Sequence, residues 1–395
     1  MELKTPRGVK DFLPVEARWK TELESEIRRI FRTWGFQEII TPTFEFFEIF
    51  EQGSINAREA YRFVGRDGEL LTLRYDLTTP IARMVASRLK DQPKPLRLAY
   101  LANVFRYDDV QVGFQREFYQ SGVELIGSAN PATDAEIIAL AITLFNTMGV
   151  KDFRLDIGQV EFFHGIMEDC QCQKTKKLIW KALLRNDLVG LRDVVNSTEL
   201  NESTKKLLLD LPQLRGQAEV LDEAYCKTEN HRARQAILNL KQVYQLLVDY
   251  GVTDQVYIDL GMVKSLEYYT GVVLEGYVPD IGFTLISGGR YDNLSSRFGN
   301  QLPAVGFALG LERLMLVLEQ QGLKPANKAQ GILVLPHDWV KALQYAKEQR
   351  QAGIQVEIDT EELTVEQAKK YAAAKNMKAL VVAGEKLEII ELAED

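Results

Sequence analysis

The chain has 395 residues, enough for two or three domains. Hydrophobic residues make up 46% and charged residues 26%, and no apolar run approaches the roughly 20 residues of a membrane-spanning helix. The first residues lack the apolar stretch of a signal peptide, so we expect a globular protein of the cytoplasm. The net charge of −8 argues against a general nucleic-acid binder, because such proteins neutralise phosphates with Lys and Arg.

Cysteine and histidine are both rare. The three cysteines (Cys170, Cys172 and Cys226) show no disulfide framework and no zinc spacing, so we expect reduced thiols. The three histidines lie far apart in the sequence, which gives no sign of a metal site or a catalytic triad. We therefore expect no metal and no cofactor, and only the fold can show whether the histidines converge.

The first 130 residues predict one helix and three extended segments. Residues 15–34 carry apolar side chains at helical spacing and end at a glycine. Residues 39–50 are β-branched and aromatic around Pro42, which cannot donate a ladder hydrogen bond and therefore favours a sheet edge or an interface. Residues 97–105 and 117–126 alternate as strands, and we expect them to form a hairpin with a long loop.

The middle of the chain changes from mixed to helical. A helix is expected to end at Met148, before Gly149. The segment 173–250 is poor in glycine and shows a period of 3.6 residues, which indicates a helical insertion. Strand-like segments return at 255–260, 271–278 and 283–287.

The last 90 residues predict a helix and a small separate domain. A helix is expected from Pro303 to about Gln321, because proline suits a first helical turn. Residues 331–395 alternate between strand and helix, which is typical of a small α/β domain. We therefore expect one large domain over residues 1–325 and a second over 331–395.

A polar row marks the predicted strand 117–126. Gln120, Gly122 and Glu124 point the same way because side chains alternate along a strand. An amide and a carboxylate on either side of a glycine would form a floor for a small polar ligand. The same pattern is equally typical of the solvated face of a sheet, so the pattern alone leaves both interpretations open.

Glycine and arginine mark three further candidates. In the predicted helix 303–321, Gly306, Gly310 and Arg313 would share one face, either as a tight packing contact or with the arginine toward a ligand. Arg106 and Arg116 flank the hairpin loop and suit phosphate or carboxylate, although single arginines usually form surface ion pairs. Residues 287–292 read as a glycine turn after a strand, which is weak support for phosphate binding.

The order of these motifs resembles that of the histidyl-tRNA synthetases, a class II aminoacyl-tRNA synthetase family. The resemblance covers about residues 1–325 and implies an α+β fold: an antiparallel sheet of six or seven strands flanked by helices. It also implies a dimer through the Pro42 region, and a C-terminal domain that looks like a shortened anticodon-binding domain. The matching peptides are Arg7–Pro14, Phe105-Arg106, Arg116–Gln120, Leu266–Gly271, Ser287–Asp292 and Gly306–Leu314.

Four positions depart from the synthetase pattern on the side that serves ATP. Asp108 stands where the family has glutamate, and Asp109 and Phe114 stand where it has arginine. Lys264 replaces the arginine that bridges the histidine carboxylate and the activated phosphate, an exchange that loses a bidentate fork. Residues 331–395 carry eight basic and twelve acidic side chains, a charge of −4 that is poor for an RNA reader.

The residues that the resemblance assigns to the histidine side match the synthetase pattern better than those on the ATP side. Aspartate stands at position 76 where the synthetases have glutamate. This pattern resembles the regulatory subunits of ATP phosphoribosyltransferase, which assemble with a short catalytic subunit in the first step of histidine biosynthesis. The candidate histidine-binding residues are Asp76, Thr78, Arg106, Gln120, Glu124, Tyr268 and Tyr269.

Three functions follow from these residues. The first is a non-catalytic regulatory subunit that is needed for the activity of the catalytic subunit and for feedback control by histidine, without tRNA or a membrane as partner. The second is an active histidyl-tRNA synthetase with unusual substitutions, against which Phe114 and Lys264 argue. The third is a stand-alone relative that senses an amino acid. We expect the first, since the site and not the fold decides function.

Overall fold

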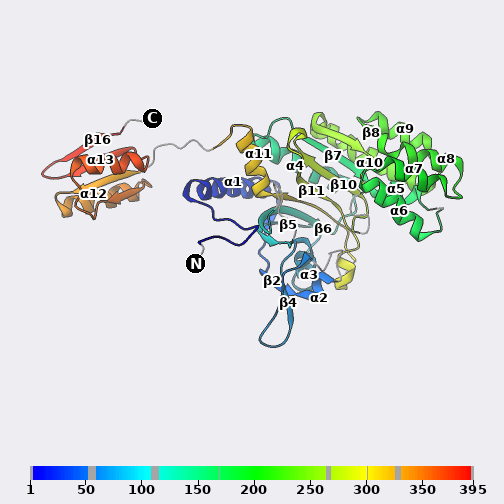
Figure 1. The fold of residues 1–395 in the computed structure, drawn as a ribbon, viewed down its shortest axis with the longest axis horizontal. Coiled ribbons are helices and arrows are strands. Elements are labelled where there is room, and N and C mark those ends of the chain that lie inside the picture. Colours follow the sequence, from blue (N-terminus) through cyan, green and yellow to red (C-terminus); the bar gives the residue numbers. More distant parts are fainter. Residues whose placement is uncertain are drawn as a thin grey trace. The chain divides into compact units, whose positions relative to one another are not determined.

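The computed structural model describes residues 3–51, 59–107, 115–168, 170–263, 268–299, 301–324 and 331–392. The chain divides into two compact units, Met1–Leu323 and Lys324–Asp395 (Figure 1). No helix within the described ranges is both long and apolar enough to cross a bilayer.

A nine-stranded mixed sheet organises the first unit. The six strands from β5 to β7 are antiparallel, as expected. The sheet is larger than expected because β1, β9 and β8 are added at its ends, with β1 parallel to β5 and β9 parallel to β7. The extra strands are short and lie at the two ends of the sheet. In spatial order the strands are β1 (Gln37–Glu38), β5 (Leu96–Phe105), β6 (Glu117–Ile126), β12 (Ala304–Gly310), β11 (Thr284–Arg290), β10 (Val272–Tyr277), β7 (Arg154–Gln159), β9 (Val256–Asp259) and β8 (Arg215–Gly216).

Helices cover the two faces of this sheet unequally. The main core lies on one face, under α1 (Pro14–Thr33) and α4 (Pro131–Met148). On the other face, α3 (Thr78–Arg88) and a short 3₁₀ turn at Ser295–Phe298 pack over the end formed by β5, β6 and β12 (Figure 1). The remainder of this second face is where polar side chains from the strands gather.

The predicted hairpin and helical insertion are both present. Strands β5 and β6 pair along their whole length. α5 (Val160–Ile166) follows β7, and β8 ties the insertion into the main sheet by pairing with β9. The helices of the segment 173–250 are α6 (Gln173–Leu184), α7 (Leu188–Asn196), α8 (Glu202–Asp210), α9 (Glu219–Lys227) and α10 (His231–Tyr250).

The predicted helix 303–321 was wrong over its first half. Residues Ala304–Gly310 form β12, a central strand, and only Leu311–Gln320 are helical (α11). Both faces of β12 are largely buried, so its sequence is a continuous apolar run without the alternation that identifies a strand. The glycine turn predicted at 287–292 was also wrong, because Gly288 and Gly289 lie inside β11.

The N-terminal part of the first unit also forms a smaller, three-stranded sheet. Its strands run in the order β2 (Phe44–Phe46), β4 (Leu70–Leu73) and β3 (Arg62–Val64), and α2 (Phe47–Glu51) follows β2. Phe44, Phe46 and Val64 are exposed on this sheet, although all three are large apolar residues.

The second unit is a four-stranded sheet with one helix on each face. α12 (Trp339–Gln351) and α13 (Val365–Ala374) each contribute two buried alanines to a separate small core. The strands run in the order β14 (Val356–Ile358), β13 (Ile332–Pro336), β15 (Ala379–Ala383) and β16 (Leu387–Glu391). The edge strand β16 was not predicted from the sequence.

Candidate amino-acid-binding site

A cavity of about 390 Å³ opens on the second face of the main sheet. Strands β6, β10, β11 and β12 supply its floor and far wall, and the segments before α3 and β10 supply the other walls. The structure places all seven candidate histidine-binding residues around this one cavity: Asp76, Thr78, Arg106, Gln120, Glu124, Tyr268 and Tyr269.

Glu124 is the buried acid at the bottom of the cavity. Its side chain is only 2% exposed, so the interpretation of this row as a solvated sheet face was wrong. One carboxyl oxygen accepts a hydrogen bond of 2.8 Å from the Thr78 hydroxyl, and the other accepts one from the Tyr291 hydroxyl. A carboxylate has about four acceptor positions, so Glu124 retains capacity for a ligand.

The floor is open because two strands carry glycine next to Glu124. Gly306 on β12 pairs with Glu124 across the ladder, and a Cβ at Gly306 would overlap the Glu124 carboxylate. A Cβ at Gly122 would overlap the Tyr100 hydroxyl and the Phe307 carbonyl oxygen. Any larger residue at either position would therefore displace the groups that surround the acid.

Burial sets the protonation of the carboxyl groups in this cavity. Burial raises the pKa of Glu124 to about 8, although the hydrogen bonds from Tyr291 and Thr78 act in the opposite direction. Burial also raises the pKa of Asp76, against the hydrogen bonds from Thr79 and the nearby Arg106 guanidinium. At neutral pH the cavity therefore holds Glu124 as a neutral carboxyl that can give up its proton to a basic ligand.

Aromatic rings form the wall above Glu124. Tyr268 stacks on Tyr291 with ring centroids 5.4 Å apart, and Tyr269 meets Tyr268 edge to face at 5.0 Å. Burial raises the pKa of Tyr268 and Tyr291 well above 10, so both hydroxyls remain protonated and can donate hydrogen bonds. The space between the Glu124 carboxyl and the stacked phenol rings would therefore suit a flat, basic ring such as an imidazole.

Arginines line the other end of the cavity. The Arg106 guanidinium lies 4.7 Å from the Tyr75 ring centroid and 5.2 Å from that of Phe118, and its Nε donates to the Tyr75 carbonyl oxygen at 3.1 Å. Arg313, in the first turn of α11, also lines the cavity, and its Nη1 donates to the Thr284 carbonyl oxygen. Arg116 is not part of the lining; its ring contact is with Tyr107.

Sequence reasoning missed several residues that complete the site. Tyr291 is the most important of them, because it holds one oxygen of Glu124. The sequence placed it only within the glycine motif 287–292, and no spacing rule connects it with Glu124, which lies 167 residues earlier. Other lining residues that were not predicted include Tyr75, Phe118, Glu275, Thr284, Ser287 and Ala308.

The four positions that depart from the synthetase pattern lie outside the described residues. These are Asp108, Asp109, Phe114 and Lys264, and the sequence alone supports the argument from them. Across the described ranges, no three His, Cys, Asp or Glu side chains form a group that could hold a metal ion.

Comparison with known proteins identifies the family. The family model described as histidyl-tRNA synthetase matches residues 8–314. The ATP phosphoribosyltransferase regulatory subunit of Acetivibrio thermocellus is 38% identical over 99% of this chain and 95% of its own length. That of Moorella thermoacetica is 41% identical over 95% of this chain and 97% of its own.

Solved structures agree with the sequence relatives. A protein of Bacillus halodurans described as ATP phosphoribosyltransferase regulatory subunit/histidyl-tRNA synthetase superposes with a TM-score of 0.87 at 32% identity, covering 98% of this chain and 99% of its own. A histidyl-tRNA synthetase of Nostoc sp. PCC 7120 gives a TM-score of 0.83 at 24% identity over 100% of this chain and 97% of its own, which shows the fold alone. The fold and family predicted from the motifs are confirmed: the chain belongs to the family of ATP phosphoribosyltransferase regulatory subunits, built on the histidyl-tRNA synthetase fold.

Proposed function

We propose that this chain activates a catalytic ATP phosphoribosyltransferase subunit and binds histidine in the cavity around Glu124 as the feedback signal. The observation that carries the histidine assignment is the Glu124 carboxyl, which is buried, held by Thr78 and Tyr291, and walled by the Tyr268 ring. The names of the related proteins support the partnership with a catalytic subunit.

Histidine has three polar groups, and the cavity offers a partner for each. The imidazole would lie against Tyr268 and bond to Glu124, which lies deepest. The α-carboxylate would meet Arg106, whose guanidinium two aromatic rings hold in place. The α-ammonium would meet Asp76, whose carboxylate already accepts the Thr79 backbone N–H at 2.9 Å. Gln120 lines the same cavity and offers both a donor and an acceptor.

The same proposal excludes aminoacylation and tRNA binding. Transfer at phosphorus depends on preorganised cations, and Phe114 and Lys264 stand where the synthetases carry arginine. The charge of −4 over residues 331–395 opposes binding of an anticodon.

Two assays on the purified chain test the proposal. Histidine-dependent ATP–pyrophosphate exchange should stay at background beside an active synthetase. Addition of the chain to the catalytic subunit should raise its phosphoribosyltransferase rate, and histidine should lower that rate again. Robust exchange would establish the synthetase instead, whereas no effect on the catalytic subunit, together with retained histidine binding, would favour a stand-alone sensor.

Histidine affinity should be constant between about pH 6.5 and pH 8 and fall on both sides. The free imidazole has a pKa of about 6.5, so between these limits the proton passes from Glu124 to the ring without exchange with solvent. Below this range the free ring is already protonated, so binding must release the Glu124 proton. Above it Glu124 is already ionised, so binding must take up a proton. Titration calorimetry in buffers of different ionisation enthalpy would reveal this, and a monotonic profile would contradict it.

The exposed apolar sheet around Pro42 supports a self-dimer. Phe44 is 54% exposed, Phe46 44% and Phe63 40%, and the strand register places all three on one face of the three-stranded sheet. Ile40, which precedes this sheet, is 86% exposed. Replacing Phe44 with aspartate should weaken the dimer at least tenfold, since a charge would enter an apolar contact (about 1.4 kcal/mol per tenfold).

Sedimentation velocity across a concentration series would measure this dimer. Val340→Asp is a suitable control, because Val340 is 76% exposed but lies on α12 of the second unit. A wild-type chain that sediments as a monomer at all concentrations would contradict the dimer.

A further inference from the structure

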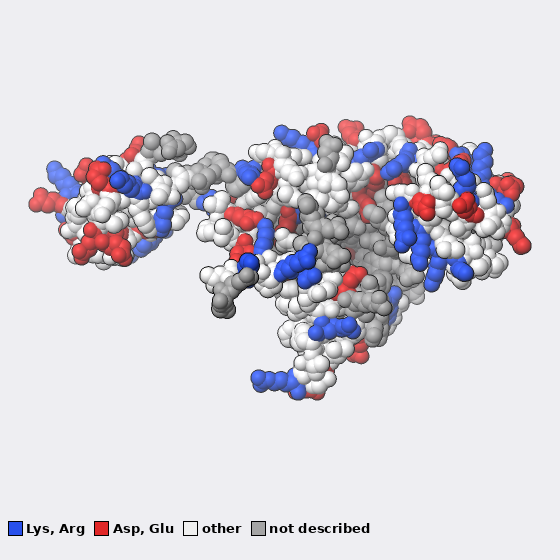
Figure 2. Space-filling model, in the orientation of Figure 1, with Lys and Arg blue, Asp and Glu red and all other residues white. Residues whose placement is uncertain are grey.

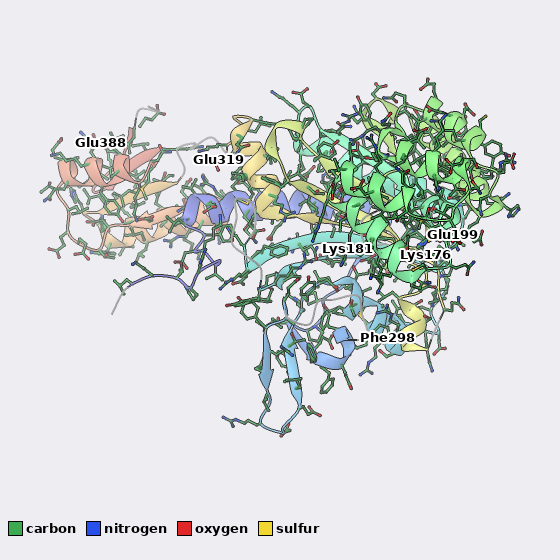
Figure 3. The ribbon with its side chains drawn as sticks, turned by 45° about the vertical axis from the view of Figure 1, so that its right-hand side comes forward. Lys176, Lys181, Glu199, Phe298, Glu319 and Glu388 are labelled. Atoms are coloured by element: carbon green, nitrogen blue, oxygen red, sulfur yellow. The ribbon has the colours of Figure 1, made fainter. Side chains whose placement is uncertain are left out.

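The outer face of α6 and the residue that follows it carry a row of cations. Lys174, Lys177, Lys181 and Arg185 are all exposed and follow at intervals of three or four residues, so they share one helical face over about 16 Å. The segment 173–186 contains five basic residues and no Asp or Glu, although the whole chain has a net charge of −8. Figure 2 shows basic side chains gathered over this part of the insertion, and Figure 3 places Lys176 and Lys181 on α6.

Of the eight other cations between residues 187 and 250, five form ion pairs. Lys205 contacts Glu202, Lys227 contacts Asp210, and Lys241 contacts Asp222. Within the part of the chain that the structure describes, none of the α6 cations forms an ion pair. The other two pairs are Arg232 with Glu161 and Arg215 with Asp259.

The row is also unfavourable for the helix itself. Like charges three and four residues apart repel one another, and each such pair destabilises a helix by a few tenths of a kcal/mol. Cations in the first turn oppose the helix dipole, and α6 has no acid there. Local stability therefore does not explain why Lys174 and Lys177 occupy these positions.

Apolar side chains border the cations. Leu178 and Leu184 on α6 are each 43% exposed, and Leu188 and Val189 at the start of α7 are 57% and 73% exposed. Protein interfaces place apolar residues at the core and polar or charged residues around the rim. RNA readers instead stack bases on exposed aromatic rings, but the single aromatic residue of this region, Trp180, is partly buried and donates its indole N–H to the Val263 carbonyl oxygen.

We propose that this α6 face is the docking surface for the catalytic subunit, and that it binds a patch of carboxylates bordered by apolar side chains. The assignment of the partner rests on the proposed function. Complementary charge would accelerate association and make it sensitive to salt.

The test is binding of the full chain to the catalytic subunit at low and high salt. The variant Lys177→Glu, Lys181→Glu, Arg185→Glu should bind at least about tenfold more weakly and lose most of its salt dependence. The control Lys347→Glu, Lys370→Glu, Lys386→Glu makes the same change of charge on exposed residues of the second unit and should bind like wild type. Histidine binding and the thermal transition would confirm that both variants fold, and the glutamine triple at 177, 181 and 185 gives a milder test.

The outcomes separate this proposal from the proposed function. If the wild type activates the catalytic subunit and the α6 variant does so with unchanged affinity, the docking surface is wrong and the function stands. If the wild type neither binds nor activates it, both fail. Salt-sensitive tRNA binding or self-association that the α6 variant loses, with binding to the catalytic subunit unchanged, would assign the face to RNA or to a second copy instead.

Discussion

Replacing Glu124 with glutamine is expected to weaken histidine binding at least about 30-fold and to abolish feedback inhibition of the assembled enzyme. The loss of one partner from a buried charged pair costs roughly 2–5 kcal/mol, and 2 kcal/mol corresponds to about 30-fold. Glutamine has nearly the same shape, so Thr78 and Tyr291 keep a neighbour of the same size. Calorimetry of histidine binding measures the first effect, and the phosphoribosyltransferase rate with histidine measures the second.

Glu312→Gln is the matched control for this prediction. Glu312 is a partly buried acid whose pKa burial raises to about 7, but its oxygens accept the Tyr119 backbone N–H outside the cavity lining. We expect this variant to keep histidine affinity within about threefold, since it retains an acceptor. Unchanged affinity in Glu124→Gln would move the histidine site away from this cavity.

Replacing Arg290 with methionine should lower the free energy of unfolding of the first unit by about 3–5 kcal/mol, because it leaves Asp134 buried without its partner. The guanidinium donates to both Asp134 oxygens, at 3.0 and 2.9 Å, and to Thr133 and the Ser128 carbonyl. Burial raises the pKa of Asp134 to about 6 even though Arg290 acts to lower it, so an isolated acid there would be more costly still.

Urea unfolding of Arg290→Met, of Asp134→Leu and of the double variant measures the coupling between these two residues. Arg232→Met is the comparison, because its ion pair with Glu161 is partly exposed and should be worth less than about 1 kcal/mol. Adding Asp134→Leu to Arg290→Met should recover much of the loss, since apolar residues can replace a buried pair. A loss below 1 kcal/mol in Arg290→Met would contradict the structural role of this pair.

Most long strands of the main sheet could be predicted from the sequence, but the central strand β12 could not. β5 and β6 were found within one residue of their ends, although burial on both sides later in β6 weakens the alternation. β12 was missed because sheet neighbours and packing bury both of its faces, which removes the alternation. Its glycines, a cost in any helix, were the available signal, because a central strand beside Glu124 requires them.

The residues of the candidate site also fall into a group that the local sequence predicts and a group that it does not. Residues on one strand, such as Gln120 and Glu124, follow from the period of two alone. Asp76, Tyr268 and Tyr269 were placed only through the family resemblance, because nothing in the local sequence connects the segment before α3 with the segment before β10. Tyr291 was missed because the sequence does not show which strand lies opposite Glu124.

The cavity exists because Gly122 and Gly306 place no side chain on its floor. A glycine codon becomes a codon for alanine, serine, valine or aspartate by one nucleotide change, and a single added carbon at Gly306 would occupy the space of the Glu124 carboxylate. The same carbon would also overlap the Val123 carbonyl oxygen on the paired strand, so the change would strain the pairing of β6 with β12. On the proposed function, one nucleotide change at this codon would remove histidine sensing, and deregulated strains should be sought first at this glycine.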